Sequence, residues 1–142
     1  MNLKYQSDMN QIMGCPPMGC KPNAVVAFRF VKEPIDTAPN FLPVCMINPA
    51  RRYRDDEVRC SAHALSLFSD AAKARKRYAE LKRTNKLVYK TIGTHLAQGA
   101  IDKTDGLVTQ PSTSGHFDLF ESVGCDLAGK FSIIEALHIA SP

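Results

Sequence analysis

The sequence predicts an α+β domain in which four to five short strands form a small mixed or antiparallel sheet and one main helix packs on one face. Three observations predict this class. Short apolar, β-branched segments are separated by turns rich in proline and glycine, one segment has helical periodicity, and 142 residues suit a single domain. We expect the domain to span residues 24–142 and residues 1–23 to form an irregular N-terminal segment or loop.

The strands are expected where β-branched and aromatic residues gather. Residues 24–32 are apolar on both sides except at Arg29, which predicts a strand that is covered on both faces. Pro43 demotes residues 41–47 to an edge strand or an extended segment. Three further segments complete the set: a short strand at 62–68, a strand bulged at Gly93 over 87–101, and a strand at 116–122. Residues 131–139 favour a strand or a short helix.

The main helix is expected over about residues 70–83. Ser69 or Asp70 is expected to cap it, because a short oxygen-bearing side chain accepts hydrogen bonds from the first free amides of a helix. Thr84-Asn85 marks its end. A narrow apolar stripe at 3-4-3 spacing is expected to face the sheet, formed by Ala71, Ala74, Tyr78 and Leu81.

Positive charge is concentrated in this segment. The net charge of the chain is +4, but residues 70–90 carry eight basic and two acidic residues, a net +6 that leaves −2 for the remainder. Such a face is either a solvated surface or a contact surface for an acidic partner, nucleic acid or protein. Our leading hypothesis is therefore a non-enzymatic binding module whose partner-binding residues are Lys73, Arg75, Lys76, Arg77, Lys82 and Arg83.

A second hypothesis is a small nucleotide-handling enzyme that uses Arg29, His116 and Glu121. A guanidinium among apolar residues needs an anion, either a carboxylate of the protein or a phosphate of a ligand. His116 lies two residues from Asp118, so both side chains share one face of a strand. A His–carboxylate pair of this kind suits acid–base chemistry near neutral pH.

The order of Arg29 on an early strand, Ser66 on a strand before a helix and Glu121 at the end of a late strand resembles the Arg–Ser–Glu pattern of ADP-ribosyltransferases. The resemblance implies that Arg29 contacts a nicotinamide dinucleotide, Ser66 supports the site and Glu121 stabilises the ribosyl cation. The chain departs from the pattern in two places. It has HALSLFS in place of the family's Ser-Thr-Ser triplet, and Asp118-Leu-Phe-Glu121 in place of its Glu-x-Glu pair.

A third hypothesis is a zinc-stapled structural domain with Cys15, Cys20, Cys60 and His63 as ligands. Zinc takes four such ligands, usually as two close pairs, and both pairs here have suitable spacing. Prolines stand between Cys15 and Cys20 where a zinc knuckle usually has glycine. The alternative is that reduced cysteines pack as small hydrophobic residues.

The sequence also suggests where the protein resides. It has no apolar run of about 20 residues and no signal-peptide pattern at its N-terminus, so we expect no membrane contact and a cytoplasmic location. All five cysteines are then expected to stay reduced. We expect no cofactor, because the sequence has no phosphate-binding loop, dinucleotide glycine fingerprint, nucleophile elbow or His-Glu-x-x-His.

Overall fold

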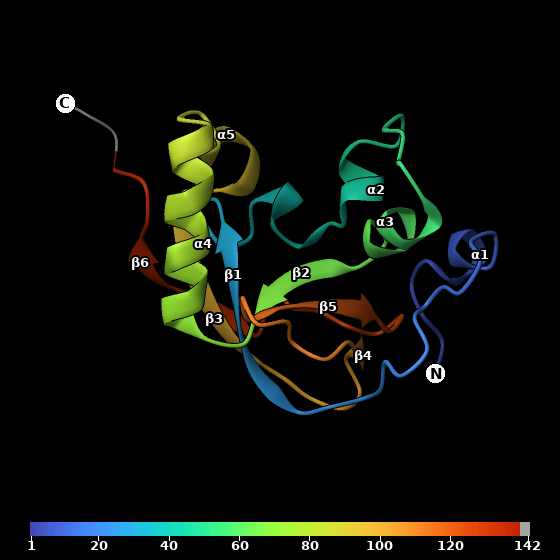
Figure 1. Cartoon of the computed structure of the whole chain (residues 1–142). Coiled ribbons are helices and arrows are strands. Elements are labelled where there is room, and N and C mark those ends of the chain that lie inside the picture. Colours follow the sequence, from blue (N-terminus) through green and yellow to red (C-terminus); the bar gives the residue numbers. More distant parts are fainter. Residues whose placement is uncertain (140–142) are drawn as a thin grey trace.

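The computed structural model, which describes residues 1–139, contains one antiparallel sheet of six strands in the order β4-β5-β2-β1-β3-β6 (Figure 1). The strands are β1 (Val25–Val31), β2 (Leu65–Phe68), β3 (His95–Ile101), β4 (Gly106–Val108), β5 (His116–Glu121) and β6 (Phe131–Ala136). The helices are α1 (Gln6–Met9), α2 (Val44–Ile47), α3 (Asp56–Ser61), α4 (Ala71–Thr84) and α5 (Tyr89–Ile92), with a 3₁₀ turn η1 at Ala38–Phe41. The α+β class is confirmed, but the sheet has more strands than the four or five predicted.

The elements with the clearest local pattern form where the sequence predicts them. The strands β1 and β5 and the helix α4 each begin and end within one residue of the expected bounds. Asp70 caps α4, since its side chain accepts a hydrogen bond of 2.9 Å from the amide of Lys73. Ala74 and Tyr78 of the expected stripe are buried against the sheet, which anchors this helix.

Other expectations are corrected by the structure. Residues 41–47 form no strand, because the turn η1 and the helix α2 occupy this stretch, with Pro43 at the start of α2. The polar segment before β2 contains α3, which Asp55 caps by accepting from the amide of Val58 at 2.9 Å. Residues 87–101 divide into α5 and β3 at Gly93, which has a φ of +114°. The strand β4 has three residues, too few to show periodicity.

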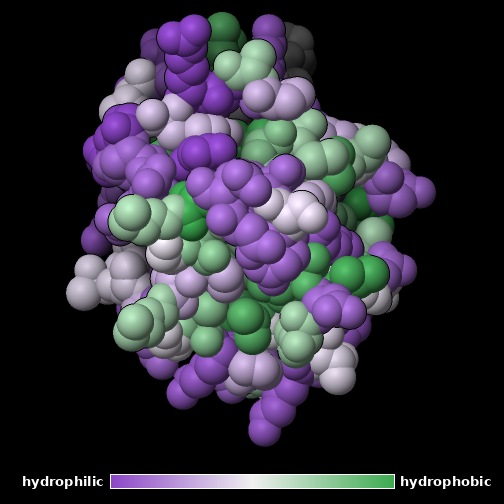
Figure 2. Space-filling model, turned by 90° about the vertical axis from the view of Figure 1, so that its right-hand side faces the viewer, coloured by the Kyte–Doolittle hydropathy of each residue, from purple (hydrophilic) through white to green (hydrophobic). Residues whose placement is uncertain are grey.

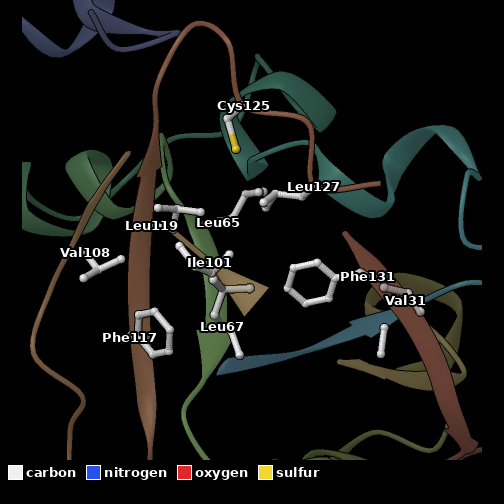
Figure 3. Packing of buried hydrophobic residues seen from close by; sticks show 12 residues of the cluster. Val31, Leu65, Leu67, Ile101, Val108, Phe117, Leu119, Cys125, Leu127 and Phe131 are labelled. Carbon is white, nitrogen blue, oxygen red and sulfur yellow. The ribbon is translucent and has the colours of Figure 1, made fainter. Parts of the chain in front are cut away.

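Side chains alternate between the two faces of the sheet, and apolar residues cover both. One face carries a core that includes Leu65, Leu67, Leu119 and Phe131. Figure 3 shows Leu65 and Leu119 pointing toward Leu127, which comes from the loop that covers this face. Burial on both faces explains why β1 has apolar residues on both of its sides.

The opposite face is covered at two places. At one end α4 packs on it, with Ala74 against Phe68 and Leu96. At the other end the N-terminal segment and α3 cover it, around a cluster that contains Phe120. These two coverings stand apart in Figure 1 and leave the middle of this face open, where Ser66 is exposed.

A disulfide joins the N-terminal segment to α3. It links Cys15 with Cys60, 45 residues apart in the sequence. The expectation that all five cysteines stay reduced is therefore wrong for this pair. Disulfides are typical of proteins of oxidising compartments, and the cytoplasmic location stays a prediction that this bond does not favour. Among residues 1–139 no helix has the length and apolar character needed to cross a membrane.

Candidate functional site: the basic face of α4

The helix α4 holds its cationic side chains away from the sheet. Tyr78 anchors the inner side, since its hydroxyl donates a hydrogen bond of 2.9 Å to the carbonyl oxygen of Gly93 and its ring packs edge-on against Phe30. The stripe that faces the sheet is apolar, so the lysines and arginines of the helix are left on the solvent side. We call the exposed cations of this side the basic face, which comprises Lys73, Lys76, Arg77, Lys82 and Arg83.

Most of these charges are not neutralised by neighbouring carboxylates. Within residues 1–139, Arg75 and Arg77 are the only cations of α4 that form an ion pair with a carboxylate. Nη2 of Arg75 lies 2.6 Å from Oε1 of Glu135 on β6, and Nε donates to the same oxygen at 2.7 Å. This pairing removes Arg75 from the set of free cations predicted from the sequence. Arg77 lies 3.4 Å from Glu80, one turn further along the same helix. The positive field of α4 therefore persists in the folded protein.

Two hollows lie along the basic face. The first, of about 140 Å³, is formed where α4 meets the loop before β5, and it is lined by Lys73, Lys76, Arg77, Glu80, Thr113 and Ser114. The second is open and is lined by Ala79, Lys82, Arg83 and Lys86 near the end of the helix. Ligand pockets for small organic molecules usually measure roughly 300–1,000 Å³, so the first hollow suits an ion or a single charged group.

The contribution of the loop before β5 is not among the residues predicted from the sequence. Thr113 and Ser114 belong to a Ser/Thr/Gly-rich stretch whose composition predicts only a loop between two strands. The residue that marks the position of this loop beside α4 is Gly115. It has a φ of +82°, and because it lacks a side chain, the aliphatic part of Lys73 packs against it. A Cβ at this position would lie 2.9 Å from Cδ of Lys73.

Arg29 is satisfied by backbone carbonyl groups. Its Nε donates to the carbonyl oxygen of Asn40 at 2.6 Å, and its Nη1 donates to that of Ser66 at 2.8 Å. Burial lowers the pKa of Arg29 to about 10, although the negative charge of Glu121 acts in the opposite direction. The guanidinium thus stays charged at neutral pH, and the structure gives it a bridging position between segments.

His116 and Ser66 meet on the open part of the sheet. Nε2 of His116 lies 2.5 Å from Oγ of Ser66 and 3.6 Å from a carboxylate oxygen of Asp118. Burial raises the pKa of Asp118, while the adjacent His116 and a hydrogen bond from Ser61 lower it. The same ring nitrogen faces both neighbours, whereas a catalytic triad requires the two nitrogens to have different partners.

Glu121 does not join this group. It is 3% exposed, and Lys4 holds one of its carboxylate oxygens at 2.7 Å. On β5 it follows the alternation of Phe117 and Leu119, so it lies on the face opposite His116. The structure therefore does not bring Arg29, His116 and Glu121 together at one point, and Glu121 is engaged in fixing the N-terminal segment.

The four residues of the zinc hypothesis do not form a ligand set. Cys15 and Cys60 are consumed by the disulfide, and a bonded sulfur is not the thiolate that zinc requires. Nδ1 of His63 faces the carbonyl oxygen of Arg59 at 2.8 Å, and Cys20 is an unbonded thiol. Across residues 1–139 no group of three or more His, Cys, Asp or Glu side chains is placed to hold a metal ion.

The side of the molecule that carries α1 and α3 interleaves hydrophobic and hydrophilic residues (Figure 2). In comparisons with known proteins, no family model, curated protein or solved structure matches the chain.

Proposed function

We propose that the protein is a binding module that uses the basic face of α4 to contact an acidic partner, a nucleic acid or a protein. The observation that supports this proposal is the pairing pattern of the cations. Lys73, Lys76, Lys82 and Arg83 have no carboxylate within 4.0 Å among residues 1–139, although Arg75 on the same helix is fully paired. Unpaired cations on one surface attract polyanions and release counterions when these bind.

The proposal is tested by removing the same number of charges from two places. The variant K76Q/K82Q/R83Q lowers the charge of the basic face by three. The matched control R51Q/R52Q/R54Q lowers the net charge equally, in the exposed loop between α2 and α3, which lies away from α4 (Figure 1). Retention is measured on columns of mixed-sequence DNA and of poly-L-glutamate, in a gradient of salt.

We expect the wild type and the loop variant to elute at similar salt concentrations and the helix variant to elute much earlier. The reason is that each lost phosphate or carboxylate contact reduces the counterions released on binding. Elution of the helix variant together with the wild type contradicts the proposal. The column that retains the wild type more strongly identifies the chemistry of the partner.

A second candidate, a small enzyme, draws support from one contact, the 2.5 Å approach of His116 to the hydroxyl of Ser66. A serine activated by a neighbouring imidazole reacts with fluorophosphonates, which makes labelling a test that needs no substrate. If Ser66 is labelled in the wild type and is not labelled in H116A, the result favours the enzyme. An unlabelled Ser66 in the folded protein excludes an activated serine at this place.

A further inference from the structure

The first hollow of the basic face combines charge with hydrogen-bond donors from a second element. Lys73, Lys76 and Arg77 come from α4, and Thr113 and Ser114 come from the loop before β5. The five side chains are exposed and line one depression. The first hollow is lined by hydroxyl groups as well as cations. Among residues 1–139, the second hollow is lined only by Ala79 and basic residues.

The loop is held in place before any ligand arrives. The amide of Ser69 donates to the carbonyl oxygen of Gly115 at 2.9 Å, which ties the loop to the start of α4. Within the loop, Gly115 donates to Ser112, and Ser112 donates to His116, each at 2.9 Å. The loop backbone is therefore held by hydrogen bonds, and Oγ of Ser114 lies 2.8 Å from Oγ of Ser112, so binding needs little reorganisation of the loop.

One cation of the hollow occupies an unfavourable part of the helix. Lys73 lies in the first turn of α4, where the helix dipole favours negative charge, and Lys76 and Arg77 follow in the second turn. The first turn contains no acidic residue, and Asp70 alone stands at the cap. An anion bound among these side chains offsets both the mutual repulsion of the cations and the interaction of Lys73 with the helix dipole. Local rules of this kind are broken mainly at functional sites.

The donors are of the kinds that contact backbone phosphates in nucleic-acid complexes: a guanidinium, two ammonium groups and two hydroxyls. A backbone phosphate carries one negative charge and two non-bridging oxygens, which accept hydrogen bonds from such donors. Lys76 of the first hollow and Arg83 of the second are seven residues apart, a rise of about 10 Å along the helix axis. Two basic hollows on one helix suit a polymer with regularly spaced phosphates.

We propose that the hollow between α4 and the loop before β5 binds a backbone phosphate of a nucleic acid, with Thr113 and Ser114 as hydroxyl donors. This inference rests on the proposed function and assigns its partner. Neither hollow is lined by an aromatic residue, so the contact recognises the phosphate backbone and not the bases. Glu80 also lines the first hollow, 3.4 Å from Arg77, and repels the phosphate that the other residues attract.

Two variants test the hollow without touching the cations. T113A/S114A removes the hydroxyl donors at constant charge, and E80Q removes the repelling carboxylate. Binding of fluorescently labelled mixed-sequence DNA and RNA strands is measured by anisotropy between about 50 and 200 mM salt. We expect T113A/S114A to weaken binding about tenfold with an unchanged salt slope, and E80Q to tighten it severalfold. R75Q, which removes a paired cation, serves as the control and is expected to bind as the wild type does.

The outcomes separate this inference from the proposed function. If T113A/S114A and E80Q both bind as the wild type while K76Q/K82Q/R83Q loses binding, the phosphate hollow is overturned and the basic face remains. If a poly-L-glutamate competitor displaces the protein more effectively than unlabelled DNA, the nucleic-acid assignment is overturned. Thermal unfolding of each variant confirms that the comparison is made between folded proteins.

Discussion

Nη1 of Arg29 donates a hydrogen bond of 2.8 Å to the carbonyl oxygen of Ser66, and this contact connects β1 to β2 beyond their registered pair of Phe28 and Phe68. The same guanidinium reaches Asn40, which itself fixes the turn after β1 through hydrogen bonds to Lys32. A charged side chain in an apolar strand thus acts as a structural bridge. Its position is determined by where backbone carbonyl groups lack partners in the sheet.

Replacing Arg29 by Met is expected to destabilise the fold by about 2 kcal/mol. The substitution removes the donor to the carbonyl groups of Asn40, which is buried, and of Ser66, which is exposed, and an unsatisfied buried acceptor costs about 1–3 kcal/mol. Urea unfolding monitored by circular dichroism measures the difference. Arg75→Met is the matched control, because an exposed ion pair contributes at most about 1 kcal/mol. Equal stability of R29M and the wild type contradicts the structural role.

Replacing Gly93 by Ala is expected to destabilise the protein strongly, by about 2 kcal/mol or more, because the new Cβ lies 2.5 Å from the carbonyl oxygen of Val31. The positive φ of 114° at this position adds to the cost. Gly124→Ala is the control, since nothing lies within 4 Å of a Cβ there. A thermal midpoint of G93A equal to that of G124A is inconsistent with the close approach of α5 to β1.

Removing the disulfide with C15S/C60S is expected to lower the free energy of unfolding by about 2–4 kcal/mol, because the bond closes a loop of 45 residues in the unfolded chain. The control is C45S, which changes an unbonded cysteine. Adding a reductant to the wild type is expected to reproduce the effect of the double variant. A wild type whose unfolding is insensitive to reductant argues against the bond.

Replacing Asp118 by Asn is expected to change how stability depends on pH. Burial raises the pKa of Asp118 in the folded state, so ionisation of this carboxyl opposes folding. Below about pH 4, where the unfolded carboxyl is also protonated, the variant and the wild type should differ least. As the pH rises through the folded pKa, the wild type loses stability relative to D118N.

Urea unfolding at a series of pH values measures the difference. Asp126→Asn, which alters an exposed carboxyl, controls for the loss of a negative charge. If the difference in free energy of unfolding between D118N and the wild type does not vary with pH, the raised pKa of Asp118 is contradicted.

The alternation of the β5 sequence already separates two of the proposed catalytic residues. His116, Asp118 and Phe120 fall on one face, and Glu121 falls on the other, as the structure shows. The enzymatic hypothesis combined residues by their order along the chain, and order carries no information about the face of a strand. By contrast, the helix and its cap were predictable, because capping and periodicity depend on residues within one or two turns.

The sequence by itself determined the α+β class, the position of α4 and the concentration of charge upon it, since these are properties of neighbouring residues. Only the tertiary structure decided which cations are free, because the partner of Arg75 is Glu135, 60 residues away on β6. It also decided that Cys15 meets Cys60 and that Thr113 and Ser114 stand beside Lys73. Contacts between distant segments depend on how the whole chain buries its apolar surface, and no local pattern encodes them.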